Sequence, residues 1–120
     1  MTKNSRYDRL DNEFSDSLNS LSFIQAEFDE YQKLKFSERT PEFFCLELNG
    51  EAGELANLEK KAWKGREIPD EKFQDEVADV FIALMNYCNA RQINLSEAVL
   101  TKLLKIERMR IELEEQGKKY

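Results

Sequence analysis

Two pairs of carboxylates, each placed within a predicted helix, constrain this chain more than any other feature. Glu51 and Glu54 are three residues apart, and so are Glu76 and Asp79. Residues three apart lie on one face of a helix, so each pair can point both carboxylates at a common spot. Twenty-one residues separate Glu54 from Glu76, which is enough to end one helix, turn and begin an antiparallel one. Four carboxylates facing each other across two helices repel one another strongly unless a cation lies between them.

The segment around the first pair is apolar on the side that carries Glu51. On a helical wheel, Glu47 and Glu54 lie at the flank of this apolar stripe, about 40° and 60° from Glu51. An ionised carboxylate in the middle of an apolar face is costly to bury unless it is paired or bound to a metal. Glu51 is therefore expected to have a functional role. The apolar residues within about 60° of it are Phe44, Leu48, Leu55, Leu58 and Ala62.

The segment that follows the second pair is apolar almost all round. Within residues 77–88, VADVFIALMNYC, only Asp79 and Asn86 are strongly polar apart from a tyrosine hydroxyl. These two residues are seven apart and share one helix face, which Glu76 and Lys72 extend toward the N-terminus. Because a helix this apolar is buried on most sides, its one polar stripe is expected to line a site.

The remaining pattern predicts helices nearly throughout. The chain has four Gly, two Pro and no β-branched runs. Thr, Asp and Asn residues supply N-cap signals for the last three helices, and Gly closes two of them. We expect an all-α four-helix bundle in one domain, residues 18–117, after a polar and loosely ordered segment, residues 1–17. The predicted helices run from about Asn19 to Phe36, from Thr40-Pro41 to Lys64, from Asp70 to Ala90 and from Asn94 to near Gly117.

The chain contains no histidine. Its absence excludes serine–histidine and cysteine–histidine hydrolysis, most zinc sites and the Glu-x-x-His ligands of di-iron bundles. A metal held by this chain must accept a site made of oxygen atoms alone, which favours magnesium, manganese or calcium.

The charge and the hydropathy of the chain limit which partners and which cellular location we expect. A net charge of −6 argues against a broad nucleic-acid-binding face. No apolar run is long enough to cross a bilayer, and the start, MTKNSRYDRL, lacks the apolar segment of a secretory signal. Cys45 and Cys88 lie in apolar surroundings and are expected to be reduced thiols. Together these features predict a cytoplasmic protein that binds neither nucleic acid nor membrane.

Residues 51–55, EAGEL, followed by residues 76–80, EVADV, resemble a known family signature. The pattern ExxE…ExxD is that of the all-α nucleoside triphosphate pyrophosphohydrolases, the MazG-like proteins. FDEYQKL, residues 28–34, is similar to the opening helix of that family, and NLSEAVLTK, residues 94–102, is similar to the start of its fourth helix. The resemblance covers roughly Leu21 to Arg110.

The resemblance implies a specific chemistry. The four carboxylates of the two pairs would hold Mg²⁺, with Mn²⁺ as the alternative, and the metal would hold the triphosphate of a ribo- or deoxyribonucleotide. Hydrolysis between the α and β phosphates would give a nucleoside monophosphate and pyrophosphate. Glu51 and Glu54 are the candidates to accept the proton of the attacking water. Members of the family form dimers or tetramers, so a homodimer or homotetramer is expected. The residues matched to substrate binding are Asn86, Lys72, Lys102 and Lys105.

Two other functions are compatible with the same sequence. One is a non-catalytic helical interaction module whose carboxylates form only an acidic patch. The other is a phosphoribosyl-ATP pyrophosphohydrolase, which uses the same scaffold and chemistry on a different substrate. The base and sugar preference does not follow from the sequence.

Overall fold

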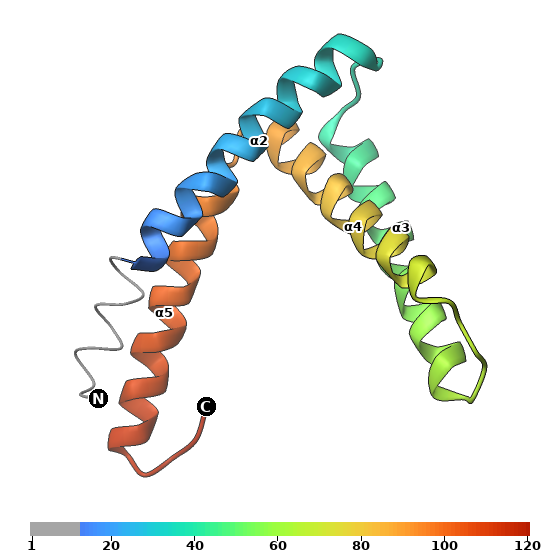
Figure 1. The fold of residues 1–120 in the computed structure, drawn as a ribbon. Helices are drawn as coiled ribbons and strands as arrows, with labels where there is room; N and C mark the ends of the chain where they lie inside the picture. Colours follow the sequence, from blue (N-terminus) through green and yellow to red (C-terminus); the bar gives the residue numbers. More distant parts are fainter. Residues whose placement is uncertain (1–12) are drawn as a thin grey trace. The chain divides into compact units, whose positions relative to one another are not determined.

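A computed structural model describes residues 13–120, and this part of the chain is all-α, with four helices and no strand (Figure 1). The all-α class and the order of the elements are therefore confirmed. The predicted loose segment, residues 1–17, lies largely outside the described residues, and the first described helix begins at Ser15 rather than at Asn19. The helices are α2 (Ser15–Lys35), α3 (Pro41–Trp63), α4 (Asp70–Arg91) and α5 (Leu95–Glu115).

The capping residues of α3 and α5 are those that the sequence predicts. Thr40 is the N-cap of α3, where its side chain accepts a hydrogen bond from the Phe43 N–H and Pro41 occupies the first turn. Asn94 is the N-cap of α5, and its Oδ1 accepts from the Glu97 N–H at 3.2 Å. Beyond α3, Gly65 has a φ of 95°, a conformation that glycine adopts without steric cost.

The predicted capping of α4 is wrong at its start. The N-cap is Pro69, which provides no side-chain hydrogen bond, and Asp70 is the first helical residue. There its carboxylate still favours the positive end of the helix dipole. At the other end α4 continues to Arg91 and is followed by Gln92, a non-glycine residue with a φ of 60°.

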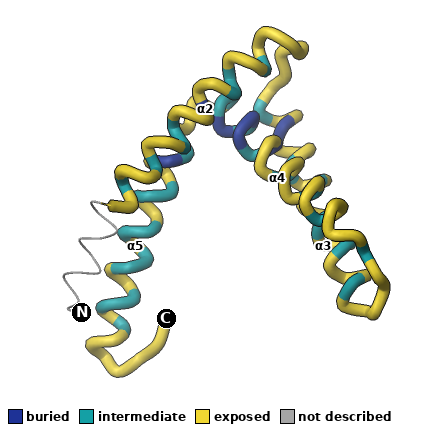
Figure 2. Tube along the Cα trace, in the orientation of Figure 1, coloured by how far each residue is buried: buried dark blue, intermediate teal, exposed yellow. Residues whose placement is uncertain are grey.

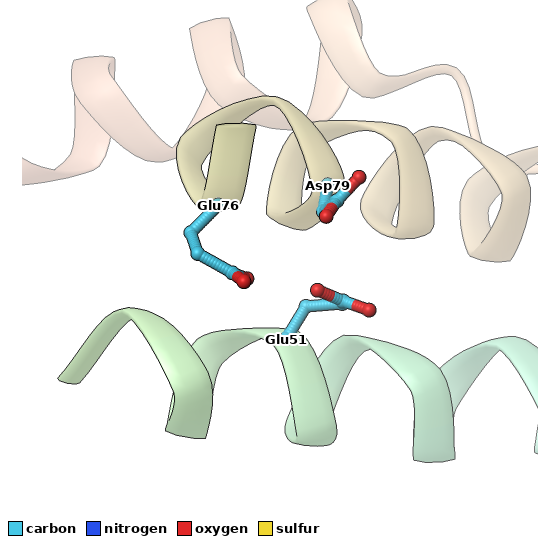
Figure 3. A group of neighbouring side chains, drawn as sticks. All are labelled: Glu51, Glu76 and Asp79. Carbon is cyan, nitrogen blue, oxygen red and sulfur yellow. The ribbon is translucent and has the colours of Figure 1, made fainter. Parts of the chain in front are cut away.

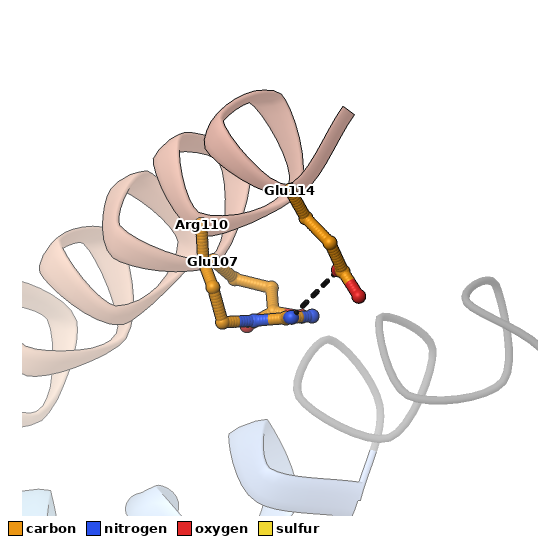
Figure 4. A network of polar contacts seen from close by, with 3 residues as sticks. All are labelled: Glu107, Arg110 and Glu114. Atoms are coloured by element: carbon orange, nitrogen blue, oxygen red, sulfur yellow. Dashed lines mark hydrogen bonds and ion pairs between the residues drawn. The ribbon is translucent and has the colours of Figure 1, made fainter. Parts of the chain in front are cut away.

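The described chain forms two compact units, of which the first combines residues 13–27 with 94–120. A polar contact joins α2 to the start of α5 in this unit. The Ser22 hydroxyl donates to Asn94 Oδ1 at 3.1 Å and also contacts the hydroxyl of buried Ser96. The Leu95 N–H donates to Gln25 Oε1 at 2.9 Å. Further along α5, Arg110 pairs with Glu107 and Glu114 (Figure 4).

The second unit, Phe28–Ile93, contains the end of α2 and the whole of α3 and α4. Helices α3 and α4 pack along each other (Figure 1). All the buried apolar residues in the described part of the chain belong to these two helices. Figure 2 marks buried positions along both of them. The core of this unit therefore lies along the α3–α4 contact, which also carries the predicted carboxylates. The buried apolar residues are Phe44, Ala83, Met85 and Cys88.

None of the described helices combines the length and the apolar character that crossing a bilayer requires.

Candidate metal site

Helices α3 and α4 bring three of the four predicted ligands together. Glu76 and Asp79 on α4 face Glu51 on α3 (Figure 3). One carboxylate oxygen of each residue lies within 4.8 Å of an oxygen of the other two. Oxygen atoms this close can coordinate a single cation. The site arises because the three-residue spacing on α4 places both its carboxylates toward α3, at the level of Glu51.

Two oxygen atoms of this group are buried without a partner. Glu51 Oε2 and Glu76 Oε2 are both shielded from solvent, and neither makes a hydrogen bond in the described part of the chain. Buried polar atoms are normally hydrogen-bonded, because an unpaired one loses its hydration without compensation. A cation or a proton between the helices would relieve both atoms.

The carboxylates also change one another's ionisation. Burial, together with the neighbouring side chains of Glu51 and Glu54, raises the pKa of Glu76 from its ordinary 4.5 to about 7. Burial likewise raises the pKa of Glu51, and the charges of Asp79 and Glu54 add to this effect, while the neighbouring Glu76 side chain opposes it. Without a cation, Glu76 therefore holds a proton up to about neutral pH.

The remaining residues that the sequence predicts for the site lie outside the group of three carboxylates. Glu54 is exposed on α3 and lies outside the group of three, although its charge acts on both Glu51 and Glu76. Lys72 is exposed in the first turn of α4, one turn before Glu76. Lys102 and Lys105 are exposed on α5, in the other unit, and their role in substrate binding stays a prediction.

Asn86 is one of the two strongly polar residues on the apolar part of α4. It is buried, with 6% of its surface exposed. It lines a cavity of about 750 Å³ formed by the end of α2, the 36–40 link, the start of α3 and the end of α4. No sequence pattern marks the other polar residues of this cavity as functional. The only features of the local sequence that accompany them are turn-forming residues in the 36–40 link and polar residues at the end of α4. The other polar residues of the cavity include Gln32, Arg39, Asn89 and Gln92.

The donor atoms fit a hard divalent cation. All three close residues offer carboxylate oxygens, and neither cysteine belongs to the group. Oxygen ligands suit Mg²⁺, Mn²⁺ and Ca²⁺, whereas Zn²⁺ sites are built mostly from histidine and cysteine.

Comparison of the chain with protein-family models, with curated proteins and with solved structures finds no match.

The raised pKa of Glu76 predicts that the metal-free protein loses stability as the pH rises. The folded state keeps the Glu76 proton up to about pH 7, whereas an ordinary carboxyl in the unfolded chain loses it near 4.5. The contribution is therefore fully present below 4.5 and is lost as the pH rises through about 7. Thermal melting in a chelator should show Tm falling across this range. Glu76→Gln should flatten that fall, and an equal fall in the variant would show that Glu76 is not its source.

Proposed function

We propose that this chain is a magnesium-dependent nucleoside triphosphate pyrophosphohydrolase of the MazG-like all-α type. It would cleave a nucleoside triphosphate between the α and β phosphates and release a nucleoside monophosphate and pyrophosphate. The proposal joins the ExxE…ExxD pattern, carried by residues 51–54 and 76–79, to the geometry of the carboxylates on α3 and α4.

The observation that carries the proposal is the meeting of Glu51, Glu76 and Asp79 across two helices, within 4.8 Å. Exposed acidic groups are common on protein surfaces and need no ligand. This group differs because two of its oxygens are buried and unpaired, and because burial raises the pKa of both Glu51 and Glu76. Carboxylates that point at one spot, and whose ionised form is unfavourable in the free protein, are typical of a binding or catalytic site.

The residues divide the chemistry among them. Glu51, Glu76 and Asp79 would hold the cation, with Glu54 beside them. Mg²⁺, when bound, neutralises phosphate charge and makes water easier to deprotonate. Glu51 and Glu54, which both lie on α3, are the candidates to accept the proton from the attacking water. Asn86, two turns along α4 from Asp79, would contact the nucleoside.

A homodimer or homotetramer is part of the proposal. Helices α3 and α4 expose large apolar side chains in a unit whose own core is small. Leu46 is 74% exposed, Val77 54% and Phe81 40%. Because a pair of helices buries only one side of each, a second copy of the chain could cover these residues. Light scattering after gel filtration would report the mass in solution.

A cytoplasmic location also belongs to the proposal. Cys45 and Cys88 are free thiols, which is the usual state of cysteine in a reducing compartment.

The proposal is tested by incubating the protein with a panel of ribo- and deoxyribonucleoside triphosphates, with Mg²⁺ or with a chelator, and identifying the products. Pyrophosphate and a nucleoside monophosphate, formed only with Mg²⁺, are expected. Orthophosphate and a nucleoside diphosphate would place the cleavage at another bond and contradict the proposal.

Phosphoribosyl-ATP belongs in the same panel, because the sister enzyme would cleave it in preference to simple triphosphates. If no triphosphate is cleaved and the metal does not change Tm, the interaction module becomes the better account.

A further inference from the structure

The cavity beside Asn86 continues toward the carboxylate group. The larger hollow, of about 750 Å³, holds Phe36, Arg39, Phe44 and Asn86 in its wall. A second hollow, of about 290 Å³, shares these four residues and adds Glu47. Both belong to the unit formed by Phe28–Ile93. The hollow space therefore extends along α3 from its first turns to the turn before Glu51.

The side chain of Asn86 has no hydrogen-bond partner among the described residues. Only 6% of the residue is exposed. An amide carries both donors and an acceptor, so a ligand that satisfies it must offer both at one edge. Planar heterocycles such as nucleobases do so. Phe36 and Phe44 provide apolar walls, and Arg39 lies over the Phe43 ring at 4.7 Å from its centroid.

Along the α3–α4 pair, the Asn86 amide comes first, Glu47 second and the carboxylate group third. Asn86 is seven residues from Asp79, which is about 10.5 Å along α4. Glu47 is four residues from Glu51, which is about 6 Å along α3 in the direction of the cavity. A nucleotide with its base at Asn86 and its phosphates at the carboxylate group would therefore have its sugar beside Glu47.

Glu47 is suited to a sugar and unsuited to a phosphate. It is exposed and makes no hydrogen bond or ion pair with another described residue. An ionised carboxylate only accepts hydrogen bonds, so it attracts hydroxyl donors and repels phosphate oxygens. A ribose offers two vicinal hydroxyls, whereas a deoxyribose offers one. Acidic side chains recognise the ribose hydroxyls in the same way in dinucleotide-binding folds.

We propose that Glu47 recognises the sugar and makes the chain prefer ribonucleoside over deoxyribonucleoside triphosphates, with the base held in the cavity at Asn86. This inference rests on the proposed function, since it uses the same carboxylate group for the phosphates. It adds the class of substrate, which the carboxylate pattern does not specify.

The test compares ATP with dATP, and CTP with dCTP, at equal Mg²⁺. The wild type should favour each ribonucleotide by about tenfold in kcat/KM, the lower end for a hydrogen bond to a charged group because Glu47 is exposed. Glu47→Ala should lower the ribonucleotide value to the deoxyribonucleotide value and leave the latter unchanged. Glu59→Ala, an exposed glutamate on α3 that lines neither hollow, is the matched control and should keep the ratio.

A second measurement separates this inference from the proposed function. Binding of adenosine and deoxyadenosine to the metal-free protein, followed by NMR shifts, requires neither phosphate nor hydrolysis. Tighter binding of adenosine that Glu47→Ala abolishes supports the assignment even if no triphosphate is cleaved. If triphosphates are cleaved with a ratio near one, or with a ratio that Glu47→Ala does not change, the sugar assignment is wrong and the hydrolysis stands. Absence of both nucleoside binding and cleavage overturns both.

Discussion

Glu51→Gln is expected to lower magnesium-dependent kcat by on the order of 10³-fold. Glu51 lies at the centre of the α3 face that meets Glu76 and Asp79, and its Oε2 is buried without a partner. Glutamine keeps the shape of the side chain but removes the negative charge, so the cation loses a ligand and the water loses a candidate base. Steady-state rates of pyrophosphate release from a nucleoside triphosphate would measure the loss.

This loss should occur without loss of folding. Because burial raises the pKa of Glu51, its ionised form is unfavourable in the metal-free protein, and a neutral side chain relieves that cost. Tm of the variant in a chelator should equal or exceed that of the wild type. Glu59→Gln, at an exposed position on the same helix, is the control and should change neither rate nor Tm. An active Glu51→Gln protein would remove Glu51 from the site.

Phe44→Ala is expected to destabilise the protein by about 3–5 kcal/mol, the cost of removing a buried phenyl ring. Phe44 is 6% exposed and is the only aromatic residue among the buried apolar side chains of the described chain. Its ring packs edge-to-face against Phe43, with the centroids 5.5 Å apart. Because this core is small, few neighbours can move to fill the space that the ring leaves.

Urea unfolding followed by circular dichroism would measure this change. Phe44→Leu retains most of the apolar volume and should cost less than about 1.5 kcal/mol. Equal effects of the two substitutions would indicate that the ring does not fill a core position. A loss below about 1 kcal/mol in Phe44→Ala would contradict its burial.

The sequence was sufficient where a single helix determines the outcome. Thr40 and Asn94 are N-caps because their short polar side chains reach the N–H three residues on, and that geometry is local. The position of Glu51 on an apolar face, and of Asp79 and Asn86 on one stripe, follows from the helical repeat alone. These inferences led to the three carboxylates that the structure brings together.

Features that depend on several segments were not predictable in the same way. The cavity at Asn86 is made by two stretches far apart in the sequence, residues 29–44 and 86–92, and no local pattern in Gln32, Arg39 or Gln92 marks them as neighbours. Gln92 ends α4 in a left-handed conformation that sequence rules assign to Gly or Asn. Asp70 is a good N-cap by residue type, but Pro69 before it takes the extended conformation of that position.

Both carboxylates of the α4 pair belong to the close group, but only one of the α3 pair does, and this difference has a physical reason. Residues three apart diverge by about 60° around a helix axis, so the rotation of each helix decides whether both members of its pair reach the neighbouring helix, as Glu76 and Asp79 do, or only one member does. On α3 that member is Glu51, and Glu54 is left exposed at the side. The facing helix then decides which carboxylates meet, and helix packing is not encoded in the spacing.

Mn²⁺ binding, followed by the loss of the electron paramagnetic resonance signal of the free ion, tests most directly whether the carboxylates form a cation site. The titration should be made well above pH 7, where Glu76 has lost its proton. The wild type should bind Mn²⁺ saturably, and Mg²⁺ should compete. Glu51→Gln and Asp79→Asn should each weaken binding by at least about tenfold, while Glu59→Gln should not. A wild type that leaves millimolar Mn²⁺ free, or variants that bind it as the wild type does, would contradict the metal site and the hydrolysis that depends on it.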